Sequence, residues 1–254
     1  MFKLQKHTLA EGYNGDQVDL HDRVILVTGA TGTIGSALCK RLAAQGATLI
    51  LASRKVPNLQ RLYDQIERAG GSQPAIYPVN LTGASPADFE QLAQTVQSEL
   101  GRLDALIHLA AEFDALAPLA ATSPEAWMAN IHTNLNAPLF LTQAMLDLLR
   151  DGDGGQVIFT VDDPERTNKA YWGAYGVSKA ATLAMASMLS EEQSEGGVAV
   201  HVVQPPPIRG ALRTRAFTAD VASAAANPDV ALDAYCYLLG ERPPSGQWLV
   251  PPAA

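Results

Sequence analysis

A glycine-rich turn directly after an apolar run is the feature that most restricts what this chain folds into. Val24 to Val27 is unbroken apolar sequence, and Gly29, Gly32 and Gly35 follow it. An apolar run without alternation predicts a parallel strand that helices cover on both faces. The glycines allow the backbone to turn tightly and to approach a pyrophosphate, whose charge would meet the free N–H groups of a helix beginning near Ile34.

This turn belongs to a complete strand, helix, strand unit that runs from Arg23 to Arg54. Apolar residues recur at helical spacing after the turn, Gly46 predicts a left-handed helix cap, and Thr48 to Ala52 forms a second apolar strand. Glycine triplets also occur in ordinary turns, so it is the surrounding unit that favours a dinucleotide site. We therefore expect an α/β fold with a doubly wound parallel sheet, the three-layer α/β/α arrangement of a Rossmann fold.

The end of the second strand indicates which dinucleotide binds. Ser53 and Arg54 stand where an acidic residue would hold the ribose hydroxyls of NAD. A guanidinium at this position favours the 2′-phosphate, so we expect NADP(H) to be preferred over NAD(H). The alternative is that Arg54 is a solvated surface residue.

Length and composition limit the remaining possibilities. A chain of 254 residues with 47% hydrophobic and 17% charged residues is typical of a globular protein with one core. We expect an N-terminal arm over residues 1–20 and a single dinucleotide-binding domain over 21–254, with a substrate loop at about 205–226. No stretch is long and apolar enough to span a membrane. A net charge of -8 without a basic cluster argues against nucleic-acid binding.

The cysteines and histidines suggest neither disulfides nor a metal. Cys39 and Cys236 stand far apart in two predicted helices, and the five histidines form no ligand pattern. The first residues also lack the apolar core of a signal peptide. We therefore expect a cytoplasmic protein without a bound metal.

The rest of the chain alternates predicted helices with predicted strands. Apolar spacing and glycine or proline boundaries predict helices over Val56 to Ala69, Pro86 to Leu100, Pro124 to Arg150 with a bend near Asn134 and Pro138, Ala174 to Glu195, and Thr218 to Leu239. Short apolar runs predict strands over Ala75 to Val79, Ala105 to Leu109, Gln156 to Val161, and Val198 to Val203.

Tyr175 and Lys179 stand four residues apart, on one face of a predicted helix and one turn from each other. Such a pair occurs by chance in many chains. Together with the unit from Arg23 to Arg54, and at the family's distance from it, the pair resembles the short-chain dehydrogenase/reductase family across nearly the whole chain. The sequence around Trp172 is similar to a compact bacterial subgroup of that family.

The resemblance implies an oxidoreductase that moves hydride between the cofactor and a small carbonyl or alcohol. Tyr175 matches the family's proton donor, and Lys179 matches the lysine that lowers the pKa of the tyrosine and binds the nicotinamide ribose. Asn134 matches the asparagine that supports a water chain. Asn80 matches the acid that contacts adenine, although a turn asparagine at a strand end is an equal alternative.

The glycine unit, the strand ends and the resemblance together give the expected cofactor-binding residues. They are Gly29, Thr31, Thr33, Ile34, Gly35, Ser53, Arg54, Asn80, Leu81, Ala110, Tyr175, Lys179, Pro205 and Ile208. The helices over Pro124 to Arg150 and Ala174 to Glu195 resemble those that family members pair about two-fold axes. We therefore expect a homodimer or a homotetramer.

Two motifs depart from the compact branch of the family toward the extended branch. Thr33 stands at the middle glycine position of the pattern Thr-Gly-x-x-x-Gly-x-Gly. His108-Leu109-Ala110-Ala111 stands where the compact branch has Asn-Asn-Ala-Gly. The extended branch carries a further substrate domain, for which 254 residues leave no room. We expect a compact fold with extended-type cofactor motifs.

Two other departures affect the nicotinamide end of the site. Asp162 stands thirteen residues before Tyr175, where the family has a serine that hydrogen-bonds the substrate carbonyl. Pro205-Pro206, Ile208 and Gly210 replace the family's Pro-Gly and the threonine that follows it. The adenosine half of the site is therefore nearer to the family's pattern than the nicotinamide half.

Asp162 decides between two functional hypotheses. Two unit charges about 4 Å apart interact by about 4 kcal/mol at an effective dielectric near 20, as much as the shift of about three pH units that Tyr175 needs at pH 7. An ionised and unpaired Asp162 would impede Tyr175, whereas a protonated, paired or averted one would not. We therefore keep two hypotheses, an NADP(H)-dependent oxidoreductase with Asp162 at its site and a weakened relative that serves as a dinucleotide-binding or protein-association module.

Overall fold

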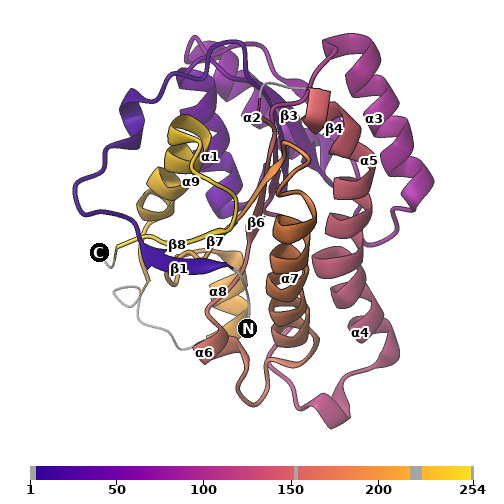
Figure 1. The fold of residues 1–254 in the computed structure, drawn as a ribbon. Helices are drawn as coiled ribbons and strands as arrows, with labels where there is room; N and C mark the ends of the chain where they lie inside the picture. The colour runs from indigo at the N-terminus through magenta and orange to yellow at the C-terminus, as the bar shows by residue number, and fades with distance from the viewer. Residues whose placement is uncertain (1–3, 152–153, 218–224, 253–254) are drawn as a thin grey trace.

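One parallel sheet organises the structure, a computed structural model that describes residues 4–151, 154–217 and 225–252. In these residues eight strands follow the order β1-β8-β7-β6-β5-β2-β3-β4 (Figure 1). The strands are β1 (Gln5–Thr8), β2 (Val24–Thr28), β3 (Thr48–Ser53), β4 (Ala75–Pro78), β5 (Ala105–His108), β6 (Gln156–Thr160), β7 (Ala199–Val203) and β8 (Gln247–Val250). The doubly wound parallel sheet predicted from the sequence is confirmed.

Helices cover both faces of this sheet (Figure 1). One face carries α1 (Thr33–Ala44), α2 (Val56–Arg68) and α9 (Asp229–Glu241), and the other carries α3 (Pro86–Leu100), α5 (Ala137–Asp151) and α7 (Gly173–Glu192). The shorter helical segments are η1 (Gly15–Gln17), η2 (Leu119–Ala121), α4 (Pro124–Ile131), η3 (His132–Asn136), α6 (Pro164–Thr167) and α8 (Ala211–Ala216). No helix in the described ranges is both long and apolar enough to cross a bilayer.

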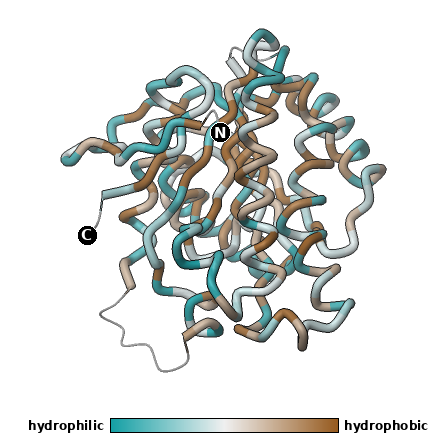
Figure 2. The backbone as a smooth tube through the Cα atoms, turned by 60° about the horizontal axis from the view of Figure 1, so that its bottom comes forward, coloured by the Kyte–Doolittle hydropathy of each residue, from teal (hydrophilic) through white to brown (hydrophobic). Residues whose placement is uncertain are grey.

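Two buried clusters show how the central strands are held. In β2, Ile25 and Val27 pack toward α1 and α9, whereas Val24 and Leu26 pack toward α3 and α5. Successive residues of a strand point to opposite faces, so an uninterrupted apolar run is buried on both. Figure 2 shows the hydrophobic stretches gathered in the strands at the centre of the molecule.

The N-terminal arm contributes a strand that the sequence did not predict. β1 pairs in parallel with β8, with Gln5 opposite Gln247 and Lys6 opposite Trp248. The side chains of β1 are exposed, so the strand lacks the apolar alternation by which strands are recognised. Its neighbour β8 was not predicted either.

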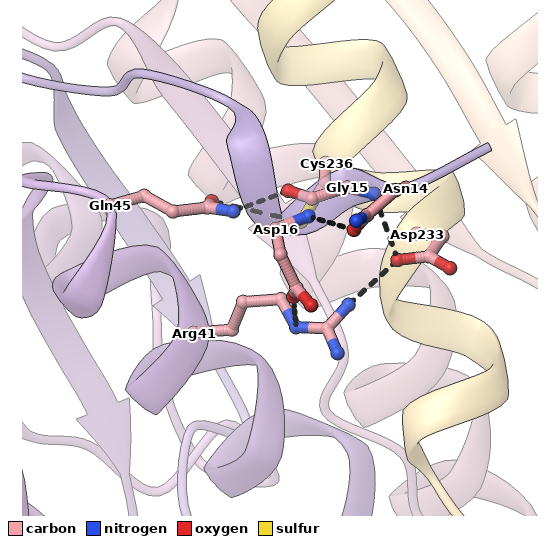
Figure 3. Close-up of polar contacts among 7 residues, drawn as sticks. All are labelled: Asn14, Gly15, Asp16, Arg41, Gln45, Asp233 and Cys236. Atoms are coloured by element: carbon pink, nitrogen blue, oxygen red, sulfur yellow. Dashed lines mark hydrogen bonds and ion pairs between the residues drawn. The ribbon is translucent and has the colours of Figure 1, made fainter.

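A polar network fastens the arm to the helices of one face (Figure 3). Arg41 on α1 pairs with Asp16 at 3.2 Å and with Asp233 on α9 at 2.7 Å. The N–H of Gly15 donates to the same Asp233 carboxylate, and Gln45 donates to the Gly15 carbonyl. The arm thus ties the end of α1 to α9.

Two predicted helices have different bounds in the structure. The long helix predicted over Pro124 to Arg150 consists of α4, one π-helical turn η3 and α5, and the π turn contains Asn134. A wide turn of this kind accommodates Pro138, which lacks a backbone donor. The predicted helix Thr218 to Leu239 begins instead at Asp229 as α9, and residues 218–224 of that prediction lie outside the described residues.

Two histidines are buried in the sheet. His201 on β7 has no hydrogen-bond partner for either ring nitrogen, and burial lowers its pKa to about 3. His108 on β5 is stacked on Phe159 and bonds Thr142, and burial, together with the charge of Lys179, lowers its pKa to about 3. Both imidazoles are therefore neutral in the folded protein near pH 7.

We predict that His201 makes the protein sensitive to acid. His201 binds a proton near pH 6.5 in the unfolded chain and only near pH 3 in the folded one. Its neutral form therefore contributes fully to the free energy of unfolding above pH 6.5, and this contribution is lost as the pH falls toward 3. At pH 5 the loss from His201 is about 2 kcal/mol. Urea unfolding at pH 7 and pH 5 should show a smaller difference in His201→Leu, whereas exposed His7→Gln should match the natural protein. An unchanged difference in His201→Leu would refute this account.

Candidate active site

A cavity of about 450 Å³ opens at the C-terminal ends of the central strands, where parallel α/β sheets bind their ligands. Most of the site residues predicted from the sequence line this cavity. They are Gly29, Thr31, Thr33, Ile34, Gly35, Ser53, Arg54, Leu81, Ala110, Asp162, Tyr175, Lys179, Pro205 and Ile208.

The structure does not bring Asn80 and Asn134 to the cavity wall. Asn80 is exposed, and its carbonyl accepts from the N–H of Gly83 in a turn after β4. This is the alternative that the sequence left open for Asn80. Asn134 is buried behind the wall.

The glycine turn allows the backbone segments at the cavity floor to touch. Gly29 has φ 66°, and a Cβ there would lie 2.7 Å from the backbone nitrogen of Ala110. A Cβ at Gly35 would lie 2.3 Å from the carbonyl oxygen of Gly29. Helix α1 then begins at Thr33 after Gly32, without a side-chain cap. Its first turn therefore presents backbone N–H groups that suit a pyrophosphate.

Two polar contacts lie at the end of the cavity beside the glycine turn. The hydroxyls of Thr31 and Ser53 are 2.6 Å apart. Arg54, after β3, pairs with Glu112, after β5, at 3.2 Å. Since β2 lies between β3 and β5, this ion pair spans the end of the strand that carries the glycine turn. Glu112 was not predicted as a site residue, because it belongs to no motif.

Asn134 holds the backbone that carries Glu112. Its amide oxygen accepts from the N–H of Glu112 at 2.7 Å, and its amide nitrogen donates to the carbonyl of Glu112 at 2.8 Å. The same nitrogen lies 3.1 Å from the hydroxyl of Ser178 on α7. The π turn at Asn134 thus connects the loop after β5 with the helix that carries the tyrosine.

Asp162, directly beyond the end of β6, joins two side chains from different helices. The hydroxyl of Tyr175 on α7 donates to Oδ2 of Asp162 at 3.0 Å. The guanidinium of Arg166 on α6 donates to Oδ1 of the same carboxylate. Of the arrangements left open by the sequence, the structure shows the paired one. Arg166 was missed, although its spacing of four residues from Asp162 was a usable signal.

The surroundings of Tyr175 do not favour its ionised form. Burial raises the pKa of Tyr175 well above 10, the charge and hydrogen bond of Asp162 raise it further, and the Arg166 charge opposes them. Lys179 donates to the carbonyl of Thr160 at 2.9 Å and lies 5.7 Å from the centre of the tyrosine ring. Burial lowers the pKa of Lys179 to about 8, although the Asp162 charge opposes this. The charge of Arg166 is thus the contribution that opposes the rise in the pKa of Tyr175.

An aromatic wall encloses the site around Tyr175. The rings of Phe113 and Trp172 lie 5.3 and 5.7 Å from the Tyr175 ring, and Ala216 on α8 packs with them. Apolar walls with few polar groups are usual where small organic molecules bind. Phe113 was also missed, because it stands in a loop without periodic pattern. In the described part of the chain, no group of three acidic, cysteine or histidine side chains is arranged to hold a metal ion.

Comparison with known proteins identifies the family. Residues 23–220 match the short chain dehydrogenase family. The chain belongs to this family. The match covers both the glycine turn and the Tyr175–Lys179 pair, so the resemblance described from the sequence is confirmed.

Members of the short chain dehydrogenase family resemble this chain over nearly its full length. The uncharacterized oxidoreductase YciK of Escherichia coli K12 is 33% identical over 229 residues, 90% of each chain. A short chain dehydrogenase structure from Pseudomonas syringae is 34% identical, with a TM-score of 0.90, and covers 97% of this chain and 100% of its own. A structure from Shigella flexneri 2a, complexed with NADP, is 32% identical, with a TM-score of 0.88 and coverages of 92% and 98%.

Proposed function

We propose that this protein is an NADP(H)-dependent oxidoreductase that moves hydride between the cofactor and a small carbonyl or alcohol, with Tyr175 as acid and base. The observation that carries this proposal is that one cavity holds both the glycine turn and Tyr175 with Lys179. Membership of the short chain dehydrogenase family agrees with it. The aromatic wall beside Tyr175 suits a small organic substrate.

The residues of the cavity fit a dinucleotide. The uncapped first turn of α1 would hold the pyrophosphate, and Arg54 with Ser53 would hold the 2′-phosphate. When bound, NADPH supplies the hydride. The Shigella flexneri relative in complex with NADP supports this cofactor class for the present chain.

The residues around the substrate would then move the proton. In carbonyl reduction the carbon gains hydride, and Tyr175 gives its hydroxyl proton to the oxygen, which becomes an alcohol. Solvent returns the proton to the tyrosinate. The buried Lys179 and the loop held by Asn134 would position the nicotinamide ribose, as the family resemblance implies. Asp162 hinders the proton transfer, because its carboxylate accepts a hydrogen bond from the hydroxyl whose proton the substrate needs.

The hydrogen bond between Tyr175 and Asp162 also supports a second candidate function. A tyrosine with a pKa raised well above 10 is a weak proton donor, and near pH 7 it is almost never ionised to serve as a base. The chain would then be a catalytically weak dinucleotide-binding or protein-association module. The two candidates differ in whether replacing Asp162 restores turnover.

For the cofactor, we predict that NADPH binds about tenfold to a hundredfold more tightly than NADH, because a charged hydrogen bond contributes about 1.5 to 3 kcal/mol. Arg54→Ala should remove most of this preference, whereas Arg68→Ala, on the exposed side of α2, should keep it. Isothermal titration calorimetry measures the NADPH and NADH affinities of each of the three proteins. Equal affinities in the natural protein would rule out the assignment of Arg54.

For catalysis, we predict weak reduction of aldehydes, ketones or quinones by the natural protein and a rise in kcat/KM of about tenfold or more in Asp162→Ser, since about 1.4 kcal/mol of barrier is tenfold in rate. Tyr175→Phe should abolish turnover. Asp163→Ser is the matched control, because Asp163 caps α6 and serine is also a good cap. A lower rate in Asp162→Ser with unchanged NADPH affinity would show that the carboxylate itself takes part in the reaction.

For assembly, we propose a homodimer or a dimer of such dimers in which α4 and α7 pair about a two-fold axis. Met128 on α4 and Met188 on α7 are 60% and 64% exposed, so both apolar side chains are available for such a contact. Light scattering at micromolar protein should give at least twice the mass of the chain, and Met188→Glu should lower it. Lys40→Glu, on the exposed side of α1, should not. A monomeric mass for the natural protein would contradict the proposal.

A further inference from the structure

The Asp162 carboxylate lies where two hydrogen-bond donors meet at the substrate end of the cavity. Its two oxygens accept from different groups, Oδ2 from Tyr175 and Oδ1 from Arg166. All three side chains line the cavity. The carboxylate is therefore already held between a phenol and a guanidinium, with one oxygen on each, so both donors converge on one small anionic group at the substrate end of the cavity.

Carbonyl reduction needs such a place. The carbonyl oxygen gains negative charge as hydride arrives, and donors aimed at that charge are among the largest contributions to catalysis. The family's serine hydroxyl donates there, but an ionised carboxylate has no proton to donate. With Asp162 at this position, Tyr175 would be the sole donor to the substrate oxygen, unless another residue also donates.

The guanidinium of Arg166 has the chemistry to do so. It carries five N–H donors in a fixed plane and keeps its charge at every working pH. The side chain of Arg166 is 23% exposed, so most of it is shielded from water. Charged hydrogen bonds are stronger in such a shielded place than in water.

The fold fixes Arg166 relative to Tyr175. Helix α6 is capped by Asp163 and docks on the start of α7. A Cβ at Gly176 would lie 2.2 Å from the carbonyl oxygen of Thr167, so the two backbones touch beside the tyrosine. The position of Arg166 therefore rests on the contact between α6 and α7 as well as on its ion pair with Asp162.

We infer that Arg166 is a catalytic residue, the second hydrogen-bond donor to the substrate oxygen, in the role that the family gives to serine. Without substrate, the Asp162 carboxylate accepts hydrogen bonds from both Arg166 and Tyr175. A substrate oxygen displaces the carboxylate when it binds. The inference rests on the proposed carbonyl reduction and names the residue that would stabilise its oxyanion. Arg166 also opposes the effect of Asp162 on the pKa of Tyr175.

A purely structural role for Arg166 would be to neutralise Asp162. The two roles separate when Asp162 is replaced by alanine, which has neither charge nor donor. If Arg166 only neutralises, Arg166→Met changes nothing in the Asp162→Ala protein. If Arg166 donates to the substrate, the same substitution removes a donor and lowers kcat.

The experiment compares Arg and Met at position 166 in two backgrounds, Asp162→Ala and Asp162→Ser, with NADPH and a panel of aldehydes and ketones. In the alanine background we expect Arg166→Met to lower kcat about a hundredfold, the usual effect of losing one oxyanion donor. In the serine background we expect only a few-fold loss, because the serine hydroxyl donates instead. Glu165→Gln, an exposed residue of α6, is the control and should change neither. Equal kcat with Arg and Met in the alanine background overturns the inference.

A second measurement does not need turnover. If no variant, including Asp162→Ser, reduces any compound of the panel, the proposed function fails. The placement of Arg166 is then tested by the pKa of Tyr175, measured from its tyrosinate absorbance after the absorbance of Tyr175→Phe has been subtracted. In the alanine background Arg166→Met should raise the pKa of Tyr175 by about one pH unit or more, because a neighbouring cation has been lost. An unchanged pKa means that Arg166 is too far from the phenol to share an oxygen with it, and this also overturns the inference. NADPH affinity by calorimetry shows that each variant is folded.

Discussion

The site depends on backbone contacts that only glycine permits. A side chain at Gly29 would collide with Ala110 after β5, and one at Gly35 would collide with Gly29 itself. Because these segments touch, β2 and β5 end side by side, and the hydroxyl of Thr28 binds the N–H groups of Leu109 and Ala110 at 3.2 and 3.4 Å. The cavity opens above this contact, so the glycine turn sets the position of one end of the cavity and of the loop that leads toward the tyrosine.

The other end of the cavity contains one buried phenol, and the charges around it set its pKa. Burial and Asp162 both stabilise the protonated form of Tyr175, and Arg166 opposes them. Lys179, the cation expected from the sequence, instead donates to the carbonyl of Thr160. The Asp162 carboxylate is paired with the guanidinium of Arg166. This pairing offsets the negative charge of Asp162 beside the phenol.

Much of the fold could be predicted because its signals are local. The unit from Arg23 to Arg54 and the helix of Tyr175 and Lys179 carry apolar spacing and turn residues within short windows. β1 could not be predicted, since its exposed side chains have no pattern and its partner β8 lies at the other end of the chain. Glu112 was missed for a related reason, because its partner Arg54 is brought to it only by tertiary packing. Arg166 differs, since its spacing of four residues from Asp162 was a local signal.

The central claim is that hydride passes from NADPH to a carbonyl carbon beside Tyr175. The most direct measurement uses NADPH deuterated at the reactive C4 position and follows the mass of the alcohol formed from a small aldehyde or ketone. The account predicts an alcohol that carries one deuterium, formed slowly by the natural protein, faster by Asp162→Ser, and not by Tyr175→Phe. Bound NADPH with no labelled alcohol from either the natural protein or Asp162→Ser would contradict it.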